Sequence, residues 1–362
     1  GKRAFLQCYS LTSITIPDGV TSIEKDAFYR CTSLTSITIP DSVTSIGEAA
    51  FYRCTSLPTI EVSTGNANYM NIEGVLFNKE KTLLHTYPAG KAGANYVIPD
   101  SVTSIGEKAF YRCTSLTSIT IPDGVTSIGS MVFSRCYSLT SITIPDSVTS
   151  IENAAFYNSK SLTSITIPDS VTSIGITAFS KCTSLTTIAI SAANVNYTDV
   201  NGVLFNKGKT SLCTYPEGKA GDYVIPNSVT SIGNYSFRYC TSLTSITIPD
   251  SVTSIGGSAF DNCTSLTSIT IGNGVTSIGG LTFADCSSLT SITIPDSVTS
   301  ITDRAFMDCT NLTAVTFLGD APYISEDNAF GGSSPTIYRK ADAKGWGDTF
   351  AGRPVKLITE KP

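Results

Sequence analysis

The chain has 362 residues, with 24 Lys and Arg against 29 Asp and Glu, and its formal net charge is −5. This mild negative charge, without a basic face, gives no reason to expect nucleic acid as a partner. No apolar run reaches the roughly 18 residues that a membrane-spanning helix needs, so we expect no insertion into a membrane.

In chain order, one pattern repeats from end to end. Residues 31–51 have the sequence CTSLTSITIPDSVTSIGEAAF, and nearly the same sequence recurs along most of the chain. Fixed self-similarity at one period is typical of a solenoid. Most copies are 23 residues apart, and each ends in one of these phenylalanines: Phe5, Phe28, Phe51, Phe110, Phe133, Phe156, Phe179, Phe237, Phe260, Phe283, Phe306 and Phe330.

One copy predicts one coil. Ser36–Ile39 alternates polar and β-branched apolar residues, which indicates a half-buried strand. Pro40 ends the strand and starts a tight turn, because it fixes φ and lacks an N–H. Gly47 permits a second change of direction, and residues 48–51 are expected to form about one helical turn. Since one coil cannot bury its own apolar face, coils should stack with parallel strands about 4.8 Å apart.

The pattern also resembles a known family. Leu34-x-x-Ile37-x-Ile39 matches the leucine-rich repeat core, and the Ile-Pro-x-x-Val-x-x-Ile-Gly-x-x-Ala-Phe-x-x-Cys that follows is similar to the BspA-like subclass of bacterial surface repeats. Pro and a second short apolar stretch replace the Asn-x-Leu that usually follows the strand. The resemblance implies a right-handed leucine-rich-repeat solenoid (a β/α superhelix), mostly β with short helical turns and with parallel strands on the concave face.

We expect one elongated solenoid domain over residues 1–362, because each coil contacts only its neighbours. Residues 63–95 and 191–222 are irregular coils, and each is predicted to carry a β-hairpin, since two apolar runs flank a short polar turn. These two segments closely repeat each other. Residues 318–362, where the repeat breaks down, are predicted to form a C-terminal cap.

Ten of the eleven cysteines fall three residues after the phenylalanine of their copy, and Ser159 takes that place in one coil. Without a Cys-x-x-Cys and with one His, the chain predicts no zinc site. We interpret the column as reduced and structural, because Cys packs well in a buried column. Disulfides between coils are the alternative, since neighbouring thiols would lie about 5 Å apart at the backbone. The column is Cys8, Cys31, Cys54, Cys113, Cys136, Cys182, Cys240, Cys263, Cys286 and Cys309.

A column of Asp follows the Pro of most copies, as in Asp41 and Asp146. A carboxylate ladder of this kind is an alternative calcium site. The turn explains the column without a metal, because Asp after Pro caps local N–H groups. We therefore expect no metal and no cofactor.

Two surfaces are candidates for ligand binding. One is the Ser- and Thr-rich strand face; the other follows each phenylalanine, where Tyr and Arg, the residue types of interface hot spots, recur. In the C-terminal half the second surface becomes acidic, at Asp285 and Asp308, which could steer a partner or favour head-to-tail contacts. A solvated sheet face and repeat drift are the simpler explanations. The candidate residues are Tyr29, Arg30, Tyr52, Arg53, Tyr111, Arg112, Thr120, Thr143 and Thr166.

The resemblance implies a non-enzymatic, cell-surface or secreted interaction module that adheres to host matrix or serum proteins or to other bacteria. The residues themselves support only an extended binding scaffold. We expect a monomer that binds a protein or glycan ligand on a host or bacterial surface. A structural spacer that displays another domain, with no ligand of its own, is the alternative. Because the chain opens inside a repeat, the missing signal peptide carries no information on location.

An enzyme, for instance a glycan hydrolase, is disfavoured. Its acidic residues would form a pair in a cleft, whereas here they form a ladder. His85 is the only histidine, and Cys213 takes its place in the second irregular coil, so no repeated site retains it.

Overall fold

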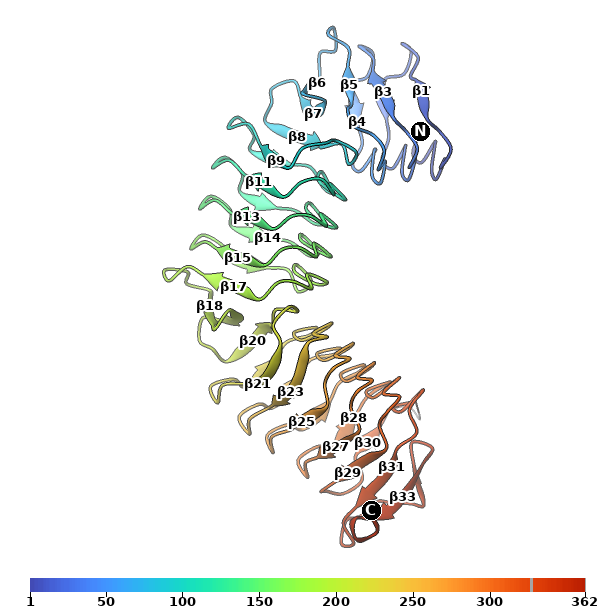
Figure 1. The fold of residues 1–362 in the computed structure, drawn as a ribbon, viewed down its shortest axis with the longest axis vertical. Coiled ribbons are helices and arrows are strands. Elements are labelled where there is room, and N and C mark those ends of the chain that lie inside the picture. The colour runs from blue at the N-terminus through green and yellow to red at the C-terminus, as the bar shows by residue number, and fades with distance from the viewer. Residues whose placement is uncertain (326–327, 362) are drawn as a thin grey trace. The chain divides into compact units, whose positions relative to one another are not determined.

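The computed structural model describes residues 1–325 and 328–361 as a β-solenoid of about 14 turns with parallel strands, as predicted (Figure 1). The chain divides into two compact units: residues 1–182 with 191–196, and residues 183–190 with the rest of the chain from 197 onward. The single-domain organisation stays a prediction.

In the first unit, a regular coil contributes two short strands to two separate series. Figure 1 shows successive strands of one series, such as β11 and β13, lying side by side. The register is one repeat, so that Ser118 faces Ser141 and Thr120 faces Thr143. The first series is β1 (Ser13–Thr15), β3 (Ser36–Ile39), β5 (Glu61–Val62), β9 (Asn95–Val97), β11 (Ser118–Thr120), β13 (Ser141–Thr143) and β15 (Ser164–Ile167); the second is β2 (Ser22–Ile23), β4 (Ser45–Ile46), β10 (Ser104–Ile105), β12 (Ser127–Ile128), β14 (Ser150–Ile151) and β16 (Ser173–Ile174).

The second unit repeats this plan. Its second series pairs without a break from β20 to β30. At the C-terminal end β32 (Thr349–Phe350) pairs antiparallel with β33 (Arg353–Leu357). The first series of this unit is β17 (Thr187–Ile190), β21 (Gly221–Val224), β23 (Leu243–Thr247), β25 (Ser268–Thr270), β27 (Ser291–Ile294), β29 (Ala314–Phe317) and β31 (Thr336–Arg339). The second series is β20 (Ser211–Thr214), β22 (Ser231–Ile232), β24 (Ser254–Ile255), β26 (Ser277–Ile278), β28 (Ser300–Ile301) and β30 (Tyr323–Ile324).

Each irregular coil contains three antiparallel strands. In the first unit these are β6 (Tyr69–Ile72), β7 (Val75–Asn78) and β8 (Leu83–Thr86). The third strand, β8, then pairs parallel with β10 and so takes its place in the second series. The second unit has the same arrangement in β18 (Tyr197–Val200), β19 (Val203–Asn206) and β20. The hairpins are part of the coil stack, since β7 is almost wholly buried.

The segment after the second strand is a series of tight turns, and the predicted helical turn is wrong. Ala49 and Arg53 have φ of 56° and 66°, which a right-handed helix excludes. Successive backbone N–H groups here donate alternately to the next coil and to their own coil. The Phe28 N–H donates to the Ala50 carbonyl of the next coil, whereas the Tyr29 N–H donates to the Asp26 carbonyl of the same coil. A helix would use its N–H groups internally and leave few to join the coils. The one helix among the described residues is the 3-10 turn η1 (Ile358–Glu360).

The repeated phenylalanines form stacks through the core of each unit. Successive rings have centroids 4.7–5.7 Å apart. In the irregular coils Tyr87 and Tyr215 take the place of Phe, with centroids 5.1 Å from Phe110 and 4.9 Å from Phe237. The phenylalanine stack therefore continues on the C-terminal side of each irregular coil.

The cysteine column is a row of hydrogen-bond donors. All eleven cysteines are free thiols, and the Cys136 Sγ donates to the Phe110 carbonyl of the preceding coil at 3.1 Å. Eight more column thiols make the equivalent bond to the Phe or Tyr carbonyl of the preceding coil. Where the column has Ser159, its hydroxyl donates to Phe133 at 2.8 Å. The exchange of Cys for Ser thus preserves a bond as well as a volume.

We expect Cys136→Ser to unfold at a higher denaturant concentration than Cys136→Ala. The two replacements have similar volumes, but only Ser retains the donor, a difference of about 0.5–1.5 kcal/mol in the free energy of unfolding. Urea titration followed by circular dichroism measures both variants against the wild type. If Ala is the more stable replacement, the column needs only small apolar side chains, and the donor is incidental.

Candidate binding surfaces

Tyr29, Tyr52 and Tyr111 form one continuous row of rings, stacked between Tyr29 and Tyr52 and tilted by 51° between Tyr52 and Tyr111. Tyr29 and Tyr52 have ring centroids 5.3 Å apart, and Tyr52 and Tyr111 are 4.3 Å apart. The structure therefore brings together three of the predicted site residues, although an irregular coil separates Tyr52 from Tyr111 in the sequence. Tyr111 is only 4% exposed, so a ligand would meet chiefly Tyr29 and Tyr52.

The predicted arginines lie against these rings. The guanidinium of Arg30 is 5.7 Å from the Tyr29 centroid, and that of Arg53 is within 5.5 Å of both Tyr52 and Tyr111. The Arg53 Nε also donates a hydrogen bond to the Tyr111 hydroxyl at 3.2 Å. Arg112 is half-buried beside Tyr111 in the chain. Cation–π contacts of this kind fix the direction of otherwise mobile side chains.

Burial also changes the chemistry of this edge. It raises the pKa of Tyr52, and the hydrogen bond with Tyr111 raises it further. The ring therefore stays neutral at physiological pH and presents a hydroxyl. Tyr52 and Arg53 thus place a neutral ring and a permanent positive charge side by side.

The strand face is exposed. Thr120, Thr143 and Thr166 all lie on the outside, and Thr120 and Thr143 are neighbours across β11 and β13. Val97 precedes Thr120 in this row and is 66% exposed. The face is thus flat and weakly polar, and it does not meet the tyrosine edge in any contact that the structure shows.

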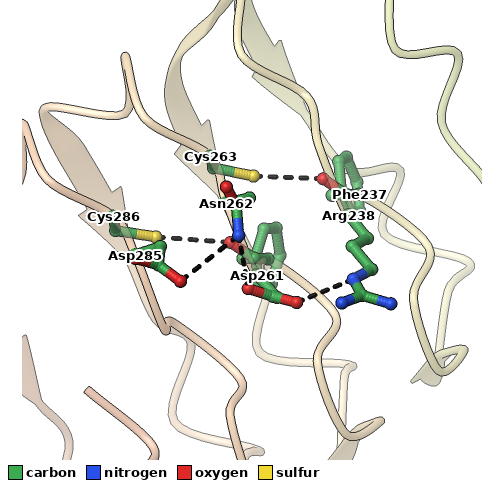
Figure 2. A network of polar contacts seen from close by, with 8 residues as sticks. Phe237, Arg238, Asp261, Asn262, Cys263, Asp285 and Cys286 are labelled. Atoms are coloured by element: carbon green, nitrogen blue, oxygen red, sulfur yellow. Dashed lines mark hydrogen bonds and ion pairs between the residues drawn. The ribbon is translucent and has the colours of Figure 1, made fainter. Parts of the chain in front are cut away.

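The corresponding edge of the second unit is acidic, as Figure 2 shows. Arg238 Nε contacts Asp261 Oδ2 at 2.7 Å, and Asn262 Nδ2 donates to Asp261 Oδ1 at 3.0 Å and to Asp285 Oδ2 at 3.3 Å. The pKa of Asp285 is raised, first by burial and then by the charges of Asp261 and Asp308. Negative charge accumulates along this edge.

The acidic and cysteine columns of the described residues do not form a metal site. In residues 1–325 and 328–361, no group of three or more His, Cys, Asp or Glu side chains is placed to hold a metal ion. In the Asp column, Asp250 Oδ1 accepts a hydrogen bond from the Asn273 N–H of the next coil at 2.7 Å. No helix in the described residues has the length and apolar character to span a bilayer.

His85 has a structural role that its sequence context does not reveal. In regular coils the carbonyl at the end of the second strand accepts from the next coil, as Ile23 does from the Gly47 N–H. At the first irregular coil, the His85 Nε2 lies 3.1 Å from the Ile46 carbonyl, and the Ile46 N–H donates to the Tyr69 hydroxyl at 2.8 Å. Side chains thus replace the missing backbone partners.

The contacts of His85 define its tautomer. Its Nε2 must carry the proton to donate to the Ile46 carbonyl, and its Nδ1 then accepts from the Thr86 hydroxyl at 2.9 Å. Burial lowers the pKa of His85, because desolvation disfavours the charged ring.

This lowered pKa predicts acid sensitivity. Between the folded-state and the unfolded-state pKa of His85, the unfolded chain binds more protons than the folded chain does. The contribution of neutral His85 to the free energy of unfolding is therefore complete above the unfolded-state pKa of about 6.5 and is lost as the pH falls below it. We expect the free energy of unfolding to decrease from pH 7.5 to pH 5.5, and His85→Gln, which keeps a donor but cannot titrate, to remove part of this decrease. Equal slopes for the two proteins in denaturant titrations would show that His85 is not the responsible group.

Known protein sequences and structures match most of this chain. A family model of the BspA type leucine rich repeat region matches in 6 copies, over residues 1–87, 90–209 and 215–336. Among curated proteins, no sequence matches. A leucine rich cell surface protein from Faecalibacterium prausnitzii A2-165 is 35% identical with a TM-score of 0.71, over 91% of this chain and 88% of that one.

Two further solved structures are similar. A leucine-rich repeat protein from Bacteroides ovatus ATCC 8483 is 25% identical with a TM-score of 0.50, over 96% of this chain and 92% of that one. The pneumococcal vaccine antigen PcpA is 21% identical with a TM-score of 0.58, over 96% and 84%, a likeness of fold alone. No catalytic family is indicated.

Proposed function

Because this chain belongs to the BspA-type leucine-rich repeat family, we propose that it is a non-enzymatic binding module of a bacterial cell surface that adheres to host matrix or serum proteins. Its similarity to the Faecalibacterium cell surface protein supports the location. The edge of the first unit that contains Tyr29, Arg30, Tyr52 and Arg53, which we call the tyrosine–arginine edge, supports the adhesion.

The observation that carries this proposal is the ordering of that edge. Tyr29 and Tyr52 are stacked, and Arg30 and Arg53 lie against them, before any partner arrives. Side chains that are already ordered lose little conformational entropy on binding. Tyr and Arg also dominate the binding energy of most protein interfaces.

The test is binding to a panel of immobilised matrix and serum proteins. We expect saturable binding to at least one protein of the panel, weakened at least tenfold by Tyr29→Ala with Tyr52→Ala. Tyr111 is left intact, because its buried ring also supports the fold. The matched control is Thr143→Ala with Thr166→Ala on the exposed strand face, which should bind like the wild type.

Two results would contradict the proposal. Loss of binding in the threonine variant alone would move the site to the strand face. No binding by folded wild-type protein would favour a structural spacer without a ligand of its own.

A further inference from the structure

Most coils have two positions with a left-handed backbone, one two residues before the phenylalanine and one two residues after it. The second of these positions differs between the two units. Arg30 and Arg53 have φ of 64° and 66°, and Asn262 and Asp285 occupy the same position in the second unit with φ of 63° and 55°. This conformation favours Gly, Asn and Asp, and it disfavours long side chains. The first unit nevertheless has basic residues at five of these positions: Arg30, Arg53, Arg112, Arg135 and Lys181.

The second unit follows the backbone preference at most of the corresponding positions. It has Asn262, Asp285, Asp308 and Gly332 there, all with positive φ. The two units share a fold and a turn, so the fold does not require arginine. Long side chains also occupy left-handed positions elsewhere, as Tyr239 and Leu281 do, so the distinguishing feature of the first unit is the recurrence of positive charge at this one position.

Four of these residues form a row, which we call the arginine row: Arg30, Arg53, Arg112 and Arg135. The contact between Tyr52 and Tyr111 keeps the row continuous across the irregular coil, and hydrogen bonds from the N–H of Arg30 to Tyr52 and from the N–H of Arg112 to Ser134 join it from coil to coil. Arg30 and Arg53 belong to adjacent coils, as do Arg112 and Arg135, and adjacent coils lie about 4.8 Å apart. The irregular coil lies between these two pairs.

The row has no acidic partner. None of the ion pairs among the described residues includes any of the four arginines. Arg30 and Arg53 lie instead against tyrosine rings. The Arg135 Nη1 donates to the Tyr137 hydroxyl at 3.4 Å. Guanidinium groups that are weakly hydrated and held in place are suited to paired hydrogen bonds with oxyanions.

We propose that the arginine row binds a linear sulfated polysaccharide. This ligand goes beyond the proposed adhesion to proteins, but it rests on the same surface location of the module. A line of cations matches a polymer with repeated anions better than it matches one small anion. Sulfate groups would accept hydrogen bonds from the guanidinium groups, and the outer edges of Tyr29 and Tyr52 would contact the sugars.

The tyrosine geometry favours a polysaccharide over nucleic acid. Single-stranded nucleic acid is held by bases that stack on open aromatic faces. The faces of Tyr29 and Tyr52 already cover each other, with 16° between the ring planes. Duplex DNA would need a broad basic surface, which a chain of net charge −5 with one row of arginines does not provide.

The experiment is calorimetric titration with heparin at about 0.15 M ionic strength, where exposed charges are substantially screened. The variant is Arg30→Asn with Arg53→Asn and Arg112→Asn, because Asn suits the left-handed backbone and should keep the melting temperature at or above that of the wild type. We expect at least thirtyfold weaker heparin binding. The control Asp285→Asn with Asp308→Asn should bind as tightly as the wild type or more tightly.

Several outcomes would overturn the inference. These are no saturable heparin binding by folded wild-type protein, equal binding by the asparagine variant, equal binding of chemically desulfated heparin, or full competition by single-stranded DNA. Self-association in low salt that both variants abolish would assign the row to the acidic edge of a second copy. If protein binding survives while heparin binding is absent, only this inference fails; if protein binding is absent, the proposed function fails separately.

Discussion

Replacing Phe260 with Ala should lower the free energy of unfolding by about 3–5 kcal/mol, the usual cost of removing a buried aromatic ring. Phe260 is fully buried, and its ring centroid lies 4.7 Å from that of Phe237 and 5.4 Å from that of Phe283. The loss of one ring therefore removes two stacking contacts. Chain on both sides fixes the positions of the neighbouring coils, so the cavity cannot close easily.

The matched control is Phe260→Leu, which refills most of the volume and should cost less than half as much. Urea titration measures both. Because each coil contacts only its neighbours, hydrogen exchange should show the largest loss of protection in the coils that contain Phe237, Phe260 and Phe283. A uniform loss of protection over the whole chain would contradict this local view of the core.

Gly175→Ala should be the second most damaging change, with a cost of about 1–3 kcal/mol from overpacking. A Cβ at Gly175 would lie 2.4 Å from the backbone N of Asn153 and 2.6 Å from the carbonyl carbon of Glu152. Backbone atoms cannot rotate away as a flexible side chain could. The coils would therefore have to separate at this point.

Gly129 provides the control in the same unit. It also follows the second strand of its coil, but a Cβ there would meet only Val132 Cγ2, at 3.6 Å. Gly129→Ala should be neutral or slightly stabilising, by up to about 1 kcal/mol, because Ala restricts the unfolded chain. Comparable melting temperatures for the two variants would show that the approach at Gly175 relaxes without cost.

Much of the fold could be predicted because one repeat defines it. The spacing around Ile37 and Ile39 predicted the strand, and the period predicted the phenylalanine stack. The turn after Gly47 was predicted wrongly, since the same short apolar spacing suits a helical turn and a chain of tight turns. Only the alternation of N–H groups between coils distinguishes the two, and that alternation depends on neighbours rather than on local sequence.

The repeat pattern predicted that the tyrosines of the candidate site occupy equivalent positions, but it did not predict which of their side chains touch. Repeat alignment placed Tyr52 and Tyr111 at equivalent positions, whereas their direct contact depends on the path of the irregular coil between them. The same path brings the His85 ring to the Ile46 carbonyl, and this contact could not be predicted from the repeat period. Irregular coils thus contain the information that a repeat cannot predict.

Every regular coil presents the same donors and acceptors to the coil before it and to the coil after it. Removing residues 141–163 would place Ser164 where Ser141 now faces Ser118, with Ile165 in the place of Ile142. The contact between successive coils is thus interchangeable, and the gain or loss of a whole repeat by unequal recombination should yield a chain that still folds. Length is therefore a property that a bacterial lineage can vary without redesigning its core.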